Sequence, residues 1–455
     1  MSTLTDRLRG VVQGTAPSAF PMGSDTRLTP RVTGSAARES LRDVLGGEWD
    51  EGRTGFVVER RLEADAVYGH VRIGDLAAQV ARGSVDASLF TGGAPARAPF
   101  VFFDLETTGL SGGAGTYAFL VGCGWFDEDG AFVMRQHVLT EYGVERAMLG
   151  RVAAEFHRAG ALVSFNGKSF DAPVLETRYL FHRLEWTAAR LPHVDVLHPA
   201  RRFWGISGAG PRASCSLMAL EEELLGIRRV GDVPGFEIPA RYFQFIRSGD
   251  ARPLAAVLEH NRLDLVSLAG LTARLLELAR EGPDRAGTPW EALALGHLFV
   301  RGGLDARARA AFERAVEMST STAHASASTV PLELVRIDAL KMLAILLRRA
   351  RQYDEAAACW RRLLDTPSCP AAAAREANEA LAIHHEHRVR DLAAAKMFAL
   401  QIAAGAEDDA TRHRLQRIER KMTNANGRPL FPSWPSSPSL LPSCDSPTSG
   451  PRTSS

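Results

Sequence analysis

The chain has 455 residues, 45% of them hydrophobic and 24% charged, with a formal net charge of +1 at pH 7. This length exceeds one ordinary domain, so we expect two or three. The near-neutral balance excludes a global electrostatic attraction to nucleic acid or membrane, and any polyanion site must therefore be local.

The five cysteines are scattered, at positions 123, 215, 359, 369 and 444, and no two form a CxxC pair. This pattern argues against a disulfide framework or a zinc cluster and favours a reduced compartment. No stretch approaches 18 apolar residues and the first residues lack a signal-type apolar core. We therefore expect a cytoplasmic protein without a membrane partner.

Residues 1–40 are rich in Gly, Ser, Thr and Arg, which predicts a flexible arm. Residues 41–99 contain short alternating segments such as 56–59 and 67–71. We expect a small β-rich annex there, and the sequence assigns it no role.

Two carboxylates, Asp104 and Glu106, stand one residue apart where the apolar run 101–105 reaches Thr107-Thr108-Gly109. Residues two apart on a strand point to the same face, so both carboxylates aim at one point. Two such close negative charges are costly unless a cation lies between them. Oxygen-ligated divalent metal is the natural solution.

Residues 100–281 read as one α/β domain. Apolar runs predict strands at 100–105, 117–126, 131–139, 161–165 and 193–196, with a hairpin about 127–130. Helical patterns cover 144–159, 170–183, 214–225 and 252–280. Three β-runs followed by alternating helix and strand predict a mixed five-stranded sheet flanked by helices.

A second acidic segment begins where the strand at 161–165 ends, with Asn166, Lys168 and Asp171. Asp171 falls in the first turn of the next helix, where the helix dipole favours an acid for purely structural reasons. Metal binding is the functional alternative, and Asn166 could hold the turn or touch substrate.

Local phosphate contacts would need basic side chains, and the candidates are Lys168, Arg201, Arg202, Arg212, Arg228 and Arg229. Arg201 and Arg202 precede Phe203 and Trp204, a combination that can stack unpaired bases. The alternative, which we favour, places the two aromatic residues in the core and the arginines on a solvated face.

His260 and Asp264 are four residues apart on an amphipathic helix, so they lie on one face, one turn from each other. A histidine above a carboxylate suits a metal site with an adjacent proton acceptor. A simple surface pair is the alternative.

Residues 288–405 are Ala-rich and helical, with a weak internal repeat. Three unevenly spaced copies begin near Leu295, Leu343 and Leu381, and their small residues resemble the tetratricopeptide pattern. A generic helical bundle is the alternative. Residues 424–455 are Ser- and Pro-rich, which predicts disorder.

Taken together, these motifs resemble those of the DEDD superfamily of 3′–5′ exonucleases on the ribonuclease H-like fold. The segments 103–109, 166–171 and 260–264 are similar to its three motifs, and the stretch at Asp195–Arg201 with Ser216-Leu217 resembles a connector of its proofreading branch. With the repeats that follow, the whole chain resembles the YprB-like group of predicted bacterial exonucleases.

The resemblance implies that two divalent cations, Mg²⁺ or Mn²⁺, are held by Asp104, Glu106, Asp171 and Asp264. It implies that Thr107, Thr108 and Gly109 lie against the terminal nucleotide and that His260 orients or deprotonates the attacking water. One feature departs from the family. Its histidine branch places the histidine five residues before the last aspartate and its tyrosine branch places a tyrosine four before, whereas His260 has the tyrosine spacing.

The function that this implies is release of nucleoside 5′-monophosphates from the 3′ end of DNA or RNA, with the repeats binding a protein partner. Three alternatives stay open. The first is a non-catalytic module that binds nucleic-acid ends while the repeats recruit a partner. The second is a protein-interaction scaffold, and the third is an endonuclease.

Overall fold

The computed structural model of the chain describes residues 41–109, 115–207, 210–211, 214–322, 330–403 and 409–426. The chain divides into two compact units, Met1–Arg314 and Ala315–Ser455. The predicted arm at 1–40 lies outside the described residues, as does the predicted tail beyond residue 426.

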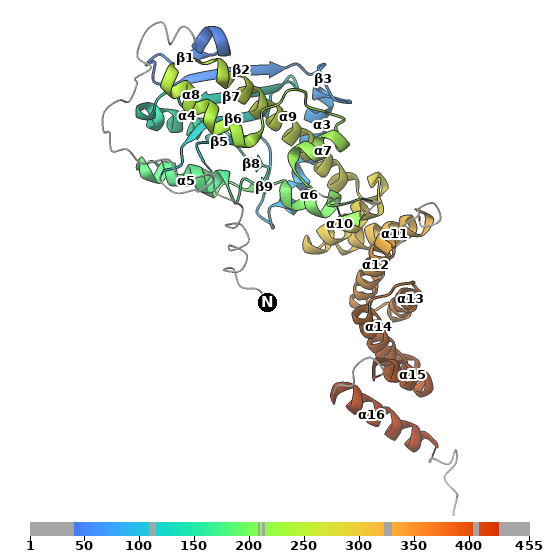
Figure 1. The fold of residues 1–455 in the computed structure, drawn as a ribbon. Coiled ribbons are helices and arrows are strands. Elements are labelled where there is room, and N and C mark those ends of the chain that lie inside the picture. Colours follow the sequence, from blue (N-terminus) through green and yellow to red (C-terminus); the bar gives the residue numbers. More distant parts are fainter. Residues whose placement is uncertain are drawn as a thin grey trace, which may run out of the picture. The chain divides into compact units, whose positions relative to one another are not determined.

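A seven-stranded mixed sheet forms the centre of the first unit (Figure 1). Its strand order is β1 (Glu48–Trp49), β2 (Phe56–Leu62), β7 (Phe132–Val138), β6 (Ala118–Phe126), β5 (Phe100–Thr107), β8 (Ala161–Ser164) and β9 (His193–Asp195). The strands from β1 to β5 pair antiparallel, while β5, β8 and β9 are parallel. The carboxyl ends of these three parallel strands therefore lie at one edge, which is where open α/β sheets bind ligands.

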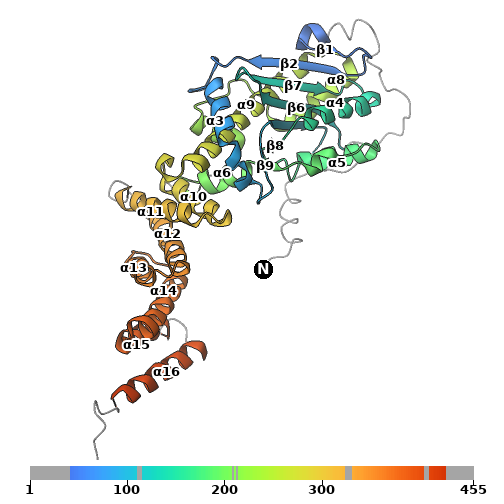
Figure 2. The ribbon, with the colours of Figure 1, turned by 180° about the vertical axis from the view of Figure 1, so that it is seen from behind.

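Helices cover both faces of this sheet. Adjacent residues of β5 show it: Phe103 packs against Phe156 of α4 (Glu145–His157), with ring centroids 5.5 Å apart. Asp104 points the other way and contacts Asn261 of α9 (Arg252–Glu281). The long helix α9 also packs against α3 (Ile73–Gly83), α7 (Leu217–Leu224) and α8 (Ile238–Ser248). Figure 2 shows α9 and α3 from behind the sheet.

The predicted ribonuclease H-like domain, with a mixed sheet flanked by helices, is confirmed. All five expected strands are present within a few residues of the predicted limits, and β6 and β7 form the expected hairpin about 127–130. The apolar pattern of the sequence predicted these strands correctly because each of them buries at least one apolar face.

The structure differs from the expectation for residues 41–99, which do not stand apart as an annex. Strand β2 adds to the edge of β7 over seven paired residues, and β1 pairs with β2, so the sheet has seven strands rather than five. Helix α3 packs against α9. This segment completes the core of the first unit because its apolar residues share that core, Phe56 and Val58 being buried beside Val138.

The C-terminal region is mostly helical. Two helices, α10 (Pro289–Arg301) and α11 (Asp305–Thr322), follow α9, and α10 packs on α6 (Leu197–Trp204). In the second unit each helix packs against its successor, from α12 to α16: α12 (Val330–Arg349), α13 (Tyr353–Leu364), α14 (Ala371–His384), α15 (Leu392–Ala403) and α16 (Asp409–Asn426). The three predicted repeat copies fall on α10–α11, α12–α13 and α14–α15, and their tetratricopeptide nature stays a prediction.

Among the described helices, none combines the length and the apolar character that crossing a bilayer requires.

Candidate active site

The first acidic pair lies on the central strand. Asp104 and Glu106 point to the α9 face of β5, near its carboxyl end, and a register shift between Glu106 and Thr107 follows them. Such bulges re-aim the chain at the ends of strands, often beside functional sites. The two carboxylates therefore share one face of the sheet because side chains two residues apart on a strand point the same way, as the sequence predicts.

Asn261 connects this strand to α9. Its Nδ2 donates to Oδ2 of Asp104 at 2.8 Å and to the backbone oxygen of Asp104 at 3.3 Å, while Gln136 of β7 donates to its Oδ1 at 2.9 Å. Gly122 of β6 lies between Asp104 and Gln136 in the sheet. A Cβ at Gly122 would stand 2.2 Å from the Asn261 Oδ1, so only glycine leaves room for this link.

The second acidic segment is a turn between β8 and α5 (Asp171–Phe181). Asn166 adopts a left-handed conformation, with φ of 67°, and its backbone N–H donates to Oδ1 of Asp195 at 2.7 Å. The backbone N–H of Lys168 donates to the other oxygen of Asp195 at 3.1 Å. A Cβ at Gly167 would stand 2.9 Å from Oδ2 of Asp171. The buried carboxylate of Asp195, at the end of β9, thus shapes the turn that presents Asp171.

Electrostatics show that the four predicted acids share one region. Burial raises the pKa of Asp104 well above its usual range, and the charges of Asp264, Glu106 and Asp171 raise it further. Burial and the charges of Asp264 and Asp171 raise the pKa of Glu106 in the same way. Burial, then the charges of Asp195 and Asp264, raise the pKa of Asp171 to about 7. The fold thus brings acidic side chains from β5, α5 and α9 close enough that their negative charges repel one another.

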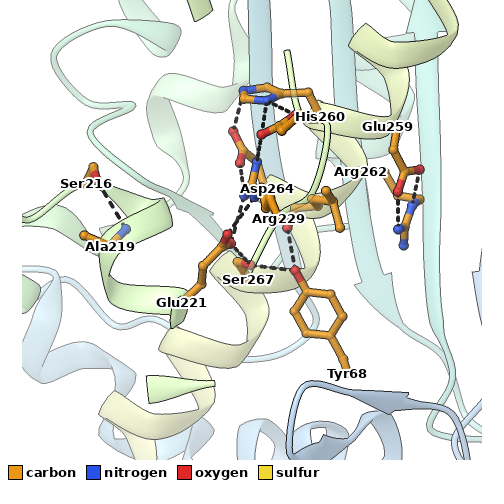
Figure 3. A network of polar contacts seen from close by, with 12 residues as sticks. Tyr68, Ser216, Ala219, Glu221, Arg229, Glu259, His260, Arg262, Asp264 and Ser267 are labelled. Carbon is orange, nitrogen blue, oxygen red and sulfur yellow. Dashed lines mark hydrogen bonds and ion pairs between the residues drawn. The ribbon is translucent and has the colours of Figure 1, made fainter. Parts of the chain in front are cut away.

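The third acidic segment lies in a polar network that surrounds Arg229 (Figure 3). The Arg229 Nη2 donates to Oδ1 of Asp264 at 2.5 Å, and its Nη1 donates to Oδ2 of Asp232 at 3.1 Å. Arg229 is itself held by Glu221 of α7, through contacts of 2.6 and 2.8 Å. Its side chain is only 1% exposed. This buried position differs from the phosphate contact that the sequence suggested for Arg229.

His260 lies between two carboxylates. Its Nδ1 is 2.8 and 2.9 Å from the two oxygens of Asp232, and its Nε2 is 3.6 Å from Oδ2 of Asp264. Burial alone would raise the pKa of Asp232, but the hydrogen bonds from His260 and Arg229 lower it overall. Because an ionised Asp232 only accepts, the bonding pattern assigns the proton of a neutral His260 to Nδ1. Its Nε2 is then a proton acceptor.

The predicted substrate contacts of the first motif, Thr107, Thr108 and Gly109, lie at the carboxyl end of β5. The Thr107 hydroxyl donates to the backbone oxygen of Gly109 at 3.0 Å, and the Thr108 Oγ1 accepts from the backbone N–H of Tyr117 at 3.0 Å. Apart from its own chain neighbours, no atom of the residues that the structure describes lies within 4 Å of a Cβ built on Gly109. The turn is therefore locked by its own hydroxyls while its glycine faces open space.

Of the basic candidates that the structure describes, Lys168, Arg201, Arg202 and Arg228 are exposed and the side chain of Arg229 is buried. Phe203 and Trp204 are buried, and the Trp204 Nε1 donates to Glu291 of α10 at 2.9 Å. The favoured alternative, aromatic residues in the core beside solvated arginines, therefore describes this helix. The idea that Arg229 grips phosphate is wrong, because its guanidinium is buried and bound to three carboxylates. Arg212 lies outside the described residues.

The donor chemistry of this site fits hard divalent cations. Its four predicted ligands are all carboxylates, and burial followed by repulsion from neighbouring carboxylates raises the pKa of three of them. Within the described parts of the chain, no group of three or more His, Cys, Asp or Glu side chains is already arranged around a common metal position. Two of the four predicted ligands are instead held by protein side chains, Asp104 by Asn261 and Asp264 by Arg229.

Comparisons with known proteins agree with this architecture. Residues 101–276 match the domain family described as the RNase_H superfamily, so the first unit carries a domain of that class. The chain is also 32% identical, over 337 residues, to the "Uncharacterized protein YprB" of Bacillus subtilis (strain 168). That match covers 71% of this chain and 75% of YprB. The chain therefore belongs to the YprB family, and its superfamily domain indicates a nucleic-acid-cleaving enzyme.

The sequence did not indicate the three side chains Glu221, Asp232 and Asn261, and it suggested a different role for a fourth, Arg229. One signal was available. Asn261 falls within the apolar stripe of α9, between Leu258 and Leu265, where a buried polar side chain needs a partner. The other three stand in α7 and a loop, and no periodicity relates them to α9.

Proposed function

We propose that this protein is a metal-dependent 3′–5′ exonuclease that releases nucleoside 5′-monophosphates from DNA or RNA. The observation that carries the proposal is the electrostatic convergence of Asp104, Glu106, Asp171 and Asp264 from three different elements. Their order and spacing resemble the motifs of the DEDD exonucleases, which supports a 3′ end as the substrate.

The chain's own residues define the chemistry. The four acids would hold two Mg²⁺ or Mn²⁺ ions, which supply charge neutralisation at phosphorus and activation of water when bound. The Nε2 of His260 accepts the proton of the attacking water, since Nδ1 is committed to Asp232. Thr107, Thr108, Gly109 and Asn166 lie at the carboxyl ends of β5 and β8 and would contact the terminal nucleotide. Exposed Lys168, Arg201 and Arg202 would contact its phosphates.

The test incubates 5′-labelled DNA and RNA oligonucleotides with the protein and Mn²⁺, Mg²⁺ or a chelator. We expect a ladder that shortens from the 3′ end, only with metal, and no cut in a circular substrate. Asp104→Asn should abolish the ladder. Cleavage of the circle would indicate an endonuclease, and metal-independent products would contradict the proposed site.

A second candidate is a non-catalytic module that binds nucleic-acid ends. One observation favours it: Arg229 already neutralises Asp264, the acid of the third motif. This candidate predicts binding of a 3′ end with no turnover at any metal concentration, so the same oligonucleotide assay separates the two. Recruitment of a protein partner by the helical repeats and a cytoplasmic location stay predictions under either candidate.

A further inference from the structure

A chain of buried polar contacts fixes Arg229 in place. The Glu221 carboxylate, 1% exposed, accepts from Nε and Nη2 of Arg229 in a fork-shaped pair. The Ser267 hydroxyl donates to the same carboxylate, and Tyr68 contacts Ser267 at 2.8 Å (Figure 3). Side chains from α7, α9 and β3 (Val67–Tyr68) therefore hold the guanidinium in one fixed position and orientation.

The fixed guanidinium of Arg229 gives the two carboxylate oxygens of Asp264 different neighbours. Oδ1 accepts from Nη2 of Arg229, while Oδ2 lies 3.6 Å from Nε2 of His260. One oxygen is thus committed to the protein, and the other faces the histidine. A carboxylate held in this way offers a cation a single, oriented oxygen.

The same guanidinium also fixes Asp232, which in turn fixes the imidazole. Nη1 of Arg229 donates to Oδ2 of Asp232, and both oxygens of Asp232 lie within 2.9 Å of Nδ1 of His260. A partner on Nδ1 decides which ring nitrogen carries the proton and how the ring is turned. In the neutral ring Asp232 therefore places the proton on Nδ1, so that Nε2, on the side of Asp264, is the acceptor nitrogen.

We propose that Arg229, anchored on Glu221, and Asp232 are positioning residues for the third motif. Arg229 holds Asp264 as a one-oxygen ligand, and Asp232 sets the tautomer and orientation of His260. This inference rests on the proposed function for its catalytic consequence. It also accounts for the unusual spacing of His260: the ring stands one helical turn from Asp264, and an acid from a distant loop turns it into place.

The first experiment measures the ring itself, without metal or substrate. Two-bond ¹H–¹⁵N spectra of the histidine-labelled protein at pH 8, with His260→Gln for assignment, should show the proton on Nδ1. Asp232→Asn should shift His260 toward the Nε2–H tautomer, because an amide can donate as well as accept. A wild-type Nε2–H tautomer, or no change in Asp232→Asn, would overturn the role of Asp232.

The second experiment measures Mn²⁺ affinity by electron paramagnetic resonance. Arg229→Gln alone would leave the charge of Glu221 buried without its partner. The matched variant is therefore Glu221→Gln/Arg229→Gln, which removes both buried charges together. We expect affinity to fall roughly 10- to 100-fold, the range typical for outer partners of metal ligands. Arg229→Lys should not restore it, since an ammonium lacks the fork that binds Glu221 and Asp264 at once. Unchanged affinity in a folded double variant would overturn the role of Arg229.

Kinetics then separate this inference from the proposed function. Asp232→Asn should lower kcat roughly 100-fold at unchanged KM and unchanged Mn²⁺ affinity, the size expected for a general base. Glu259→Gln, which disturbs only the surface pair with Arg262 on the same helix, is the control. A wild type that cleaves nothing, with the tautomer and affinity results intact, removes the exonuclease and supports the positioning roles. If the wild type is active and Asp232→Asn has the same kcat, the positioning role of Asp232 is wrong while the proposed function stands.

Discussion

The acids of β5 and the acid of α9 are held by different means. Asp104 and Glu106 share a face because a strand alternates, and the paired neighbours β6 and β8 fix that strand on both sides. Helical spacing brings His260 and Asp264 to one face, but their orientation depends on Arg229 and Asp232, two side chains of the loop that follows α7. Backbone hydrogen bonds position the first pair, and buried ion pairs position the second.

The largest expected effect comes from breaking the strand-held pair. Asp104→Asn keeps an oxygen that can accept from Asn261 but removes the charge that a cation needs. We expect cleavage to fall by roughly 10³-fold or more, the equivalent of several kcal/mol of transition-state stabilisation. Thermal unfolding without metal should occur at a higher temperature than in the wild type, because the variant avoids burying a charge and relieves the repulsion from Asp264, Glu106 and Asp171. A lower melting temperature would contradict the electrostatic account of the site.

Breaking the network around α9 should instead cost stability. Arg229→Met leaves the carboxylate of Glu221 buried without its cation, and removing one partner of a buried pair costs about 3–5 kcal/mol. Urea unfolding measures this loss. Glu221→Gln/Arg229→Gln should recover most of it, whereas an equally unstable double variant would show that packing, not charge, sets the cost.

The pH dependence of stability sharpens the contrast, because the pKa of Asp171 is raised, whereas the pKa of Asp232, which is paired with His260 and Arg229, is lowered. The pKa of Asp171 is raised to about 7, so the folded protein binds a proton that the unfolded chain releases near pH 4. The stabilisation is complete below the unfolded value and is lost as pH rises through about 7. Between pH 5 and pH 8 Asp171 alone should lower the unfolding free energy of the metal-free protein by roughly 2 kcal/mol, and urea unfolding of Asp171→Asn should show a pH-dependent loss that is smaller by this amount. An equal pH-dependent loss in the wild type and the variant would contradict the prediction.

The smallest effect should come from the link between the two regions. Asn261→Ala removes the donor to Asp104 and leaves Gln136 without its side-chain acceptor. We expect a loss of about 1–3 kcal/mol, the usual cost of unsatisfied buried polar groups. Gln136 keeps its bond to the backbone oxygen of Leu258 at 2.7 Å, which limits the damage. Glu259→Gln, on the exposed side of α9, should stay within about 0.5 kcal/mol of the wild type. Equal losses in both variants would remove Asn261 from the site.

The sequence alone determined five of the seven sheet strands, the carboxylate pair on β5 and the helical pairing of His260 with Asp264. Each is encoded within a few residues, where a period of 2 or 3.6 fixes which side chains share a face. It did not reveal that β2 joins the same sheet, since pairing with β7 is a contact between distant segments.

Only the tertiary structure decided what surrounds those acids. Arg229 looked like a phosphate contact, and its burial against Glu221 became visible only when α7 packed on α9. Asp232 and Asp195 likewise act on residues 28 and 29 positions away. Local periodicity carries no information about such partners, because the fold that brings them together is set by the burial of the whole core.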